Sequence, residues 1–268
     1  MLFRRRFSLT RRRGKRENDQ KYIIEKVLKA SMKIFDIGAN IGYYVLLQNN
    51  KIGNKGKILA IEPSPKNVKL LKKNLSVNNL RKGKVKIIEG AVSNFNGNKK
   101  FYLSNQSNLH TFHKNGSAKD FLNGNTINVE VFRLSKIIKE NYSPDLIRMD
   151  IEGHEVEILE SIYEDLQKKA YAPPIICFEP HISSYNQNHD LKPILKRLFK
   201  INYFTDYLSS NSFDGTKRIK SLNKKYVEEK LIESDGETRA IFRNINAKDT
   251  ISILTKIGGA RTVLLKPK

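Results

Sequence analysis

The chain has 268 residues, 39% of them hydrophobic, and carries 50 basic and 27 acidic side chains for a formal net charge of +23. This length favours one domain with insertions and a substantial buried core. No apolar run approaches the ~18 residues needed to cross a bilayer, and the single cysteine, Cys177, excludes an intrachain disulfide. The positive charge predicts attraction to anionic partners such as nucleic acid or acidic lipid surfaces, without choosing between them.

The chain begins with a strongly basic segment. Residues 1–16 hold eight basic side chains and no acidic one, and they lack the apolar core of a secretory signal. We expect a disordered arm in a cytoplasmic protein, with Arg4 to Arg16 able to hold it peripherally at an anionic membrane surface. Residues 17–245 should form the folded domain, beginning with an amphipathic helix over 17–31. Residues 246–268 remain a C-terminal tail without an assigned structure.

The stretch 33–44, K-I-F-D-I-G-A-N-I-G-Y-Y, predicts a strand, a glycine-containing turn and a helix. Gly38 and Gly42 let backbone N–H groups approach a ligand closely, and the acidic Asp36 beside the turn suits a cationic group. A second strand over 57–61 ends at Glu62, 24 residues after Gly38, where a ribose-binding carboxylate is expected. The pattern predicts a nucleoside-binding half-domain, although the glycines could simply end a buried strand in another α/β protein.

The turn departs from the dinucleotide fingerprint. The pattern G-x-G-x-x-G requires glycine at positions 40 and 43, where this chain has Asn40 and Tyr43. NAD is therefore disfavoured. A D-x-G-x-N-x-G turn followed by a glutamate at the end of the next strand resembles the class I S-adenosylmethionine (SAM) methyltransferases.

The middle of the chain continues the alternation of strands and helices, with one long interruption. Ser64 and Pro65 begin a helix, and a third strand over 85–89 leads to Gly90, Ala91 and Val92. Two short strands, 100–103 and 127–134, flank a polar segment over 104–125. Its length favours a flap over the site rather than a structureless spacer. We expect its two histidines, 110 and 113, to be solvent-exposed rather than metal ligands.

Acidic and histidine side chains follow two further strands, 145–149 and 175–178. In an open parallel sheet, ligands bind at the carboxyl ends of the strands, so these residues are candidates for catalysis. A histidine or a carboxylate could remove a proton from a hydroxyl acceptor, and Glu155 could instead cap the following helix. We expect Asp150 to face the cofactor or the substrate. Alternatively, Asp150, Glu179 and a third oxygen ligand could hold Mg²⁺. The candidates for the base are His154, Glu152 and His181. Beyond these strands, residues 201–207 and 239–245 could pair as an antiparallel edge.

Taken together, the motifs resemble the FkbM-type methyltransferase family. The matching blocks are D-I-G-A-N-I-G-Y-Y at 36–44, I-E-P-S-P-K-N at 61–67, L-K-K-N-L-S-V-N at 71–78, E-G-A-V-S at 89–93, D-L-I-R-M-D-I-E-G-H-E at 145–155 and F-E-P-H at 178–181. The resemblance implies an α/β class I Rossmann-like fold, with a mostly parallel seven-stranded sheet and helices on both faces, and SAM as methyl donor. It further implies the following cofactor contacts: Asp36, Gly38, Asn40 and Gly42 on the methionine side, Glu62 on the ribose, and Ala91 and Val92 on the adenine. Asp150, Glu152, His154, Glu179 and His181 would face the acceptor.

Three functions are consistent with these features. The first is SAM-dependent O-methylation of a hydroxyl on a sugar, glycan, glycolipid or other small molecule. The second is RNA methylation, favoured by the charge and by E-P-S-P-K-N, which resembles tRNA guanine methyltransferases. Against it, the fourth strand ends in D-I-E-G rather than in an Asn-Pro-Pro type of motif. The third is a non-catalytic tethering module, disfavoured by the intact Asp36, Glu62 and Asp150.

Overall fold

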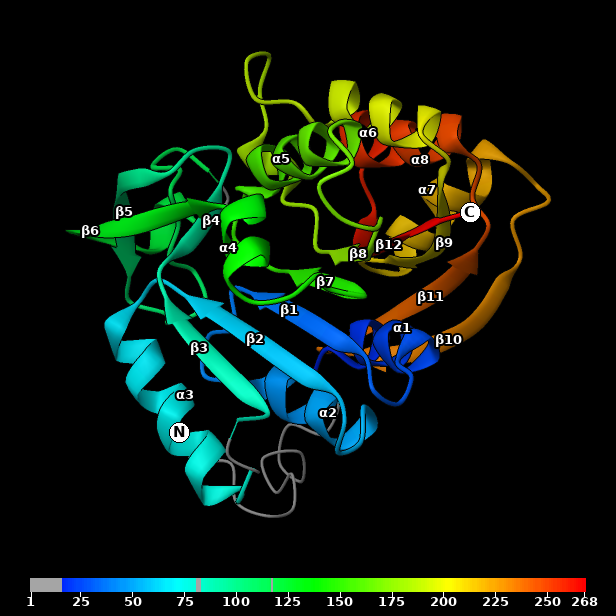
Figure 1. Cartoon of the computed structure of the whole chain (residues 1–268). Helices are drawn as coiled ribbons and strands as arrows, with labels where there is room; N and C mark the ends of the chain where they lie inside the picture. The colour runs from blue at the N-terminus through cyan, green and yellow to red at the C-terminus, as the bar shows by residue number, and fades with distance from the viewer. Residues whose placement is uncertain (1–15, 81–82, 117) are drawn as a thin grey trace.

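Parallel strands that alternate with helices build the core of the protein. The computed structural model describes residues 16–80, 83–116 and 118–268, so the predicted basic arm, apart from Arg16, lies outside the described residues. Within these ranges nine strands form one sheet in the order β10-β11-β9-β12-β8-β7-β1-β2-β3. The five strands β8, β7, β1, β2 and β3 are parallel to one another. This confirms the predicted α/β fold with a mostly parallel central sheet (Figure 1).

Strands and helices alternate along the first half of the chain in the order that the sequence predicts. The strands are β1 Lys33–Ile37, β2 Lys57–Glu62, β3 Val85–Glu89, β4 Ala91–Ser93, β5 Gly97–Ser104, β6 Leu122–Arg133, β7 Leu146–Met149, β8 Ile175–Phe178, β9 Tyr203–Ser210, β10 Glu228–Ser234, β11 Glu237–Arg243 and β12 Ala260–Pro267. The helices are α1 Asn18–Val27, α2 Tyr43–Lys51, α3 Pro65–Val77, α4 Leu134–Glu140, α5 Glu155–Gln167, α6 Leu191–Lys200, α7 Phe213–Leu222 and α8 Ala247–Ser252, with short 3-10 turns η2 Lys119–Phe121 and η3 Ile182–Ser184 and a π-helical turn η4 Ile253–Ile257.

Helices cover both faces of the sheet, as predicted. Successive residues of a strand point to opposite faces, so Ile34 packs in a core with α1, α2 and α3, whereas Phe35 packs in a second core with α4, α5, α6 and α8. Figure 1 shows the two helical layers on either side of the strands. Asp36 and Arg148 lie on the same face as Ile34 and Leu146, toward α1 and α2, because they alternate with Phe35 and Ile147 along β1 and β7.

The C-terminal residues, which the sequence left unassigned, complete the sheet. After α8, β12 lies between β8 and β9 and is antiparallel to both. The predicted antiparallel pair forms as β9 and β11, with Ile241 opposite Ser209, but β9 is interior and β10 is the edge strand. The sheet therefore has two strands more than the seven expected, and the folded unit continues past residue 245.

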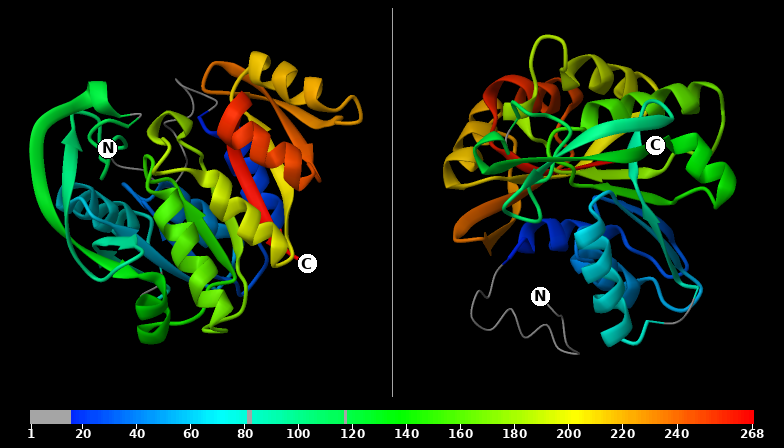
Figure 2. Two further views of the ribbon diagram at one scale, coloured as in Figure 1. Left: turned by 90° about the horizontal axis from the view of Figure 1, so that it is seen from above. Right: turned by 90° about the vertical axis from the view of Figure 1, so that its left-hand side faces the viewer.

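A small second sheet stands beside β3. Its order is β4-β6-β5, and Figure 2 shows it at one side of the molecule, away from β12. The polar segment between β5 and β6 corresponds to the predicted flap. Tyr102 and Thr111 exchange backbone hydrogen bonds at 2.8 and 3.1 Å, which fold the flap back along β5.

Candidate active site

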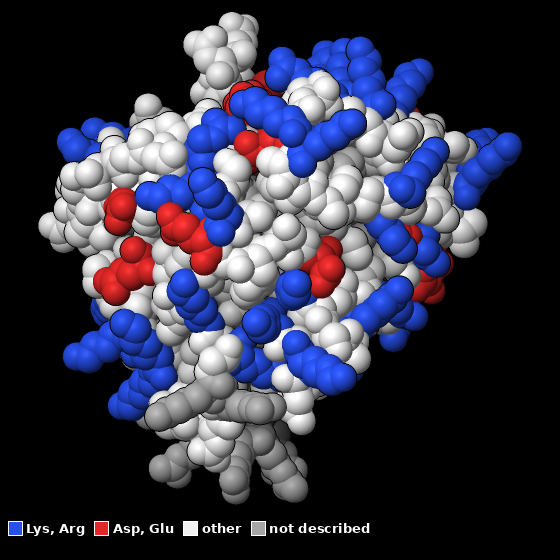
Figure 3. Space-filling view, in the orientation of Figure 1, with Lys and Arg blue, Asp and Glu red and all other residues white. Residues whose placement is uncertain are grey.

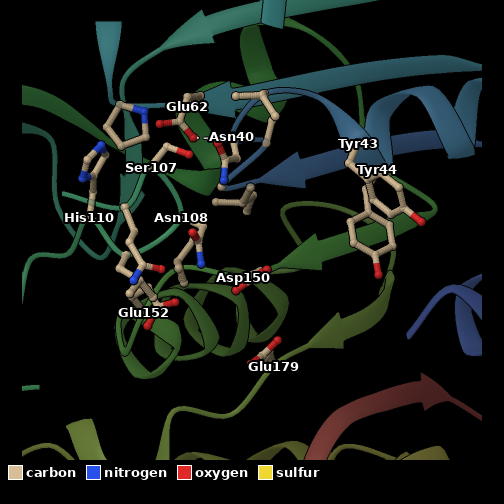
Figure 4. Close-up of a pocket in the computed structure, with 18 of the residues that line it drawn as sticks. Asn40, Tyr43, Tyr44, Glu62, Ser107, Asn108, His110, Asp150, Glu152 and Glu179 are labelled. Carbon is tan, nitrogen blue, oxygen red and sulfur yellow. Dashed lines mark hydrogen bonds between the residues drawn. The ribbon is translucent and has the colours of Figure 1, made fainter. Parts of the chain in front are cut away.

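A cavity of about 1270 Å³ opens at the carboxyl ends of the parallel strands. Loops after β1, β2, β3, β7 and β8 line it, together with the flap, Arg261 of β12 and the turn between β10 and β11. Figure 4 shows Asn40 and Glu62 on one side, with the flap residues Ser107 and His110 near them. Asp150, Glu152 and Glu179 lie on the opposite side. This is the edge at which the sequence analysis placed the ligand.

The turn after β1 is held in shape by Glu62. One carboxylate oxygen of Glu62 accepts from Asn40 N at 2.9 Å (Figure 4). The other accepts from Ser64 N at 3.0 Å and from Asn67 Nδ2 at 3.2 Å. A carboxylate has about four acceptor positions, so a ligand hydroxyl can still bind. Burial raises the pKa of Glu62 to about 7, against the opposing effect of these N–H donors.

Gly38 is required because the chain passes very close to β7. Its φ is +76°, and a Cβ there would lie 2.2 Å from the backbone oxygen of Asp150. Gly38 N and Ala39 N donate to Ile61 O at 2.9 and 3.1 Å, so the turn also rests on the end of β2. Gly42 begins α2 at φ +90°, packed against Leu71. It is not among the residues that line the cavity.

Asp36 lies beneath the cavity rather than in its wall. It is fully buried, and its Oδ1 lies 3.3 Å from Arg148 Nη1. Burial raises its pKa to about 6 despite the nearby guanidinium. Arg148 does line the cavity, and it donates to Asp150 Oδ2 at 2.8 Å and to Gln20 Oε1 at 3.0 Å. Asp36 can therefore act on a ligand only by holding Arg148, which also stacks on Tyr44 at 4.1 Å.

Two carboxylates on the far side of the cavity are paired with arginines. Asp150 is paired with Arg148, which holds the pKa of Asp150 below its ordinary value against the effect of burial. Glu179, at the end of β8, is ion-paired with Arg261. Burial and the nearby Asp150 raise the pKa of Glu179 to about 8, against the effect of Arg261. Because Arg148 and Arg261 neutralise Asp150 and Glu179, little net negative charge remains there to bind Mg²⁺. Among the described residues, Asp150 and Glu179 also do not belong to the same set of converging ligands. The converging set at this side of the cavity, among the described residues, is Asp150, Glu152 and His181.

Glu152 lines the cavity and is backed by His181. It has a left-handed backbone at φ 51°, and its Oε2 lies 3.4 Å from His181 Nε2. The other ring nitrogen of His181 lies 2.8 Å from Glu155 Oε1, and Tyr185 donates to Glu155 Oε2 at 2.7 Å. The pKa of His181 is raised well above its ordinary value because these carboxylates outweigh burial. A protonated His181 holds Glu152 in place and cannot itself accept a proton.

His154 lines the cavity with both ring nitrogens engaged. Nε2 lies 3.1 Å from Ser93 Oγ, and Nδ1 lies 3.2 Å from both His113 Nε2 and Glu157 Oε1. Burial lowers the pKa of His154, so the ring is neutral near pH 7. Glu155, predicted as a helix cap, lies in the first turn of α5, but α5 has no side-chain cap hydrogen bond; its carboxylate accepts instead from Gly153 N, which precedes the helix, at 3.2 Å.

The flap covers the cavity, and its two histidines are half-buried. Residues 105–110 and Phe112 line the cavity, and Asn67 Nδ2 donates to Ser107 O at 2.9 Å, which fixes the flap to α3. The expectation of exposed histidines was wrong. His110 accepts from Ser104 N at 2.9 Å, and His113 packs against His154 and His189.

The structure adds residues to the site that the sequence analysis did not assign. Arg148 and Arg261 both line the cavity. Arg148 is part of the motif at 145–155 but was given no role, and Arg261 belongs to the C-terminal segment that was left unassigned. The run Thr262 to Leu265 after two glycines could have indicated β12. Gly38, Asn40, Glu62, Ala91, Val92, Asp150, Glu152, His154 and Glu179 all line the cavity, whereas Asp36, Gly42 and His181 lie behind it.

Comparison with known proteins agrees with this arrangement. The family model described as "Methyltransferase FkbM domain" matches residues 36–205, more than half of the chain. The chain belongs to the FkbM methyltransferase domain family. This confirms the resemblance drawn from the motifs. One relative, the methyltransferase sdnD of Sordaria araneosa, is 30% identical over 159 residues, a match that covers 49% of this chain and 61% of the relative. The chain thus spans about three fifths of that relative's length.

Two solved structures resemble this chain at low sequence identity. The methyltransferase FkbM from Methylobacillus flagellatus KT matches with 17% identity and a TM-score of 0.42, over 79% of this chain and 43% of that one. A SAM-dependent O-methyltransferase from Thermotoga maritima matches with 13% identity and a TM-score of 0.42, over 93% of this chain and 64% of that one. The family assignment rests on the match over residues 36–205, because TM-scores this low say little.

On the face of the molecule shown in Figure 3, the positive charge is not gathered into one patch. Figure 3 shows lysine and arginine side chains spread over the face in view, with acidic side chains among them. In the part of the chain that the structure describes, no helix is long and apolar enough to cross a membrane.

Proposed function

We propose that the chain is a SAM-dependent methyltransferase that methylates a hydroxyl oxygen of a sugar, glycan, glycolipid or other small-molecule acceptor. Membership of the FkbM methyltransferase domain family supports methyl transfer. The observation that carries the proposal is the cavity itself. Asn40 and Glu62 lie on one side and Asp150 and Glu152 on the other, so a nucleoside and an acceptor can meet in one cavity.

The residues present fit SAM. Asn40 Oδ1 is buried with no hydrogen-bond partner among the described residues, and a polar ligand group would satisfy this orphaned acceptor. Glu62 has acceptor capacity left for a ribose hydroxyl. Asp150 suits the ammonium of the amino-acid portion, and Arg148 suits its carboxylate. Ala91 and Val92 give an apolar wall for the adenine.

For the chemical step we assign the proton acceptor to Glu152. SAM, when bound, supplies an electrophilic methyl carbon attached to a sulfonium sulfur. Glu152 would accept the proton of the acceptor hydroxyl on a carboxylate oxygen as that hydroxyl oxygen attacks, and the protonated His181 behind it fixes the orientation of the carboxylate. Such a base contributes about 10²- to 10⁴-fold to the rate, and positioning of the two reactants contributes much of the rest.

Isothermal titration with SAM tests the donor part of the proposal. We expect binding of one SAM per chain with a dissociation constant below about 1 mM, the upper end of ordinary substrate affinities. No heat of binding in the millimolar range would end the proposal. The acceptor is sought by untargeted mass spectrometry of glycans and small molecules with and without the protein, as the gain of one methyl group.

Two variants separate the candidate bases. Glu152→Gln should leave SAM binding unchanged and lower turnover by about 10²-fold or more. His154→Ala should retain more activity, because its ring nitrogens are already engaged with Ser93, His113 and Glu157. Full activity in Glu152→Gln together with a large loss in His154→Ala would return the role of base to His154.

RNA methylation remains the alternative, supported by the net charge of +23. The spread of lysine and arginine in Figure 3 gives it no defined track for a nucleic-acid backbone. Radiolabelled methyl groups that appear in RNA but not in the glycan fraction would favour this alternative over the proposal.

A further inference from the structure

A cluster of three imidazoles and one carboxylate lies beside the active site. This histidine cluster consists of His113 in the flap, His154 and Glu157 at the start of α5, and His189 in the loop before α6. The chain has five histidines in all, and three of them meet here around a single glutamate. None of these groups is needed for the proton transfer assigned to Glu152.

The nitrogen and oxygen atoms of the cluster face one another. His113 Nε2 and His154 Nδ1 are 3.2 Å apart, and they lie 3.8 and 3.2 Å from Glu157 Oε1. His189 Nε2 lies 2.9 Å from Glu157 Oε2. In a tetrahedral zinc site with bonds near 2.0 Å, neighbouring ligand atoms are about 3.3 Å apart. The separations of the two histidines from Glu157, 3.8 Å for His113 and 2.9 Å for His189, lie on either side of this value, and the ligand atoms of His113, Glu157 and His189 are all within 4.8 Å of one another.

Hydrogen bonds on the outer side fix which ring nitrogen faces inward. His189 Nδ1 lies 3.3 Å from the backbone oxygen of Ser184, and a carbonyl can only accept, so Nδ1 carries the hydrogen. With Nδ1 turned outward, Nε2 is the ring nitrogen that faces Glu157, and in a neutral ring its lone pair is available to an ion between the two groups. His154 Nε2 is similarly engaged by Ser93 Oγ. Outer contacts of this kind orient metal-bound histidines in general.

We propose that His113, Glu157 and His189 bind a divalent transition-metal ion of the zinc type. The three side chains of the proposed core are 15–20% exposed, so an ion can reach them from solvent. Imidazole nitrogens with one carboxylate suit zinc, whereas Mg²⁺ and Ca²⁺ prefer oxygen ligands.

The ion would join three separate segments. His113 belongs to the flap that covers the cavity, and the flap is otherwise tied down near this point by Thr111 Oγ1, which donates to Glu152 O at 2.8 Å. Metal binding would fasten the flap to α5 and to the loop before α6. The site would thus be structural, holding the cavity closed, and it does not depend on which methyl donor or acceptor is used.

Equilibrium dialysis of the chelator-treated full chain against Zn²⁺, with metal quantified by mass spectrometry, tests the proposal. We expect one bound zinc per chain and loss of at least about 100-fold in affinity in His189→Ala and in Glu157→Gln. His110→Gln, which removes the other flap histidine outside the cluster, should bind zinc like the wild type. An excess of Mg²⁺ should not displace the zinc.

Cobalt substitution provides a second readout that does not depend on the stability of the variants. The wild-type chain loaded with Co²⁺ should show the strong visible absorption of tetrahedral coordination, and circular dichroism checks that each variant is folded. Absence of zinc binding by the wild type would overturn the proposal. Wild-type affinity in folded His189→Ala, or equal displacement by Mg²⁺, would overturn it as well.

Discussion

The carboxylate of Glu62 is the group whose change should best distinguish a nucleoside pocket from an ordinary structural turn. Its two oxygens accept three hydrogen bonds, from Asn40 N, Ser64 N and Asn67 Nδ2. In Glu62→Gln one oxygen becomes an NH₂ group, which cannot accept. In one orientation of the amide the N–H of Asn40 loses its acceptor, and in the other orientation both remaining donors lose theirs.

The size of the effect follows from these contacts. One orphaned buried donor costs about 1–3 kcal/mol, so the free energy of unfolding of Glu62→Gln should fall by about that amount. A hydrogen bond from a ribose hydroxyl to a charged acceptor contributes about 1.5–3 kcal/mol. Its loss should raise the dissociation constant for SAM about 10- to 100-fold.

Urea unfolding followed by circular dichroism and isothermal titration with SAM measure the two quantities. Glu89→Gln is the matched control, because Glu89 pairs with Glu62 in the register of β2 and β3 but is exposed. That variant should stay within about 0.5 kcal/mol of the wild type. Equal SAM affinity in the two variants would refute the role given to Glu62.

Three further predictions concern the surroundings of the cavity. Gly38→Ala should prevent folding, because the new Cβ would lie 2.2 Å from a backbone oxygen. Gly53→Ala is the control: Gly53 is also at positive φ but in open space, so this change should lower the free energy of unfolding by only about 1–2 kcal/mol. Equal soluble yield and equal stability in urea for the two variants would contradict this prediction. Arg148→Met should lower the free energy of unfolding by about 3–5 kcal/mol, because Asp36 becomes a buried charge without its partner. The double variant Arg148→Met with Asp36→Asn should regain part of the lost free energy of unfolding, as measured in urea. No regain would argue against the pairing of Asp36 with Arg148. The pKa of His181 is raised above its ordinary value by Glu155 and Glu152, against the effect of burial. Its stabilisation is therefore full below about pH 6.5 and is lost as the pH rises through the folded value. The unfolding free energy of the wild type relative to His181→Gln should fall as the pH rises above about 6.5, and a difference that is constant with pH would contradict the assignment.

The parts of the fold that could be predicted are those fixed by local sequence. β1 with its glycine turn, and α3 with Ser64 at its N-cap, follow from patterns within about ten residues. The place of Glu62 followed from its spacing to Gly38. The position of β12 between β8 and β9 could not be predicted, because a strand far along the chain selects its neighbours through packing rather than through local pattern.

The side-chain partners in the site were the other part that local sequence could not provide. Asp36 was expected to contact the cofactor, yet β1 turns it toward α1 and α2, where the arginine two positions before Asp150 reaches it. His181 is separated from Glu155 by 26 residues, but the two are in contact because β7 and β8 are adjacent. Such contacts depend on which strands are neighbours, and a single sequence does not give that order.

A crystal soaked with SAM tests the central claim most directly. The account predicts the donor in the cavity at the ends of β1 and β2, with a ribose hydroxyl within about 3 Å of a Glu62 oxygen and the amino-acid portion beside Gly38 and Asp150. A donor bound elsewhere on the chain, or one whose ribose faces away from Glu62, would contradict it.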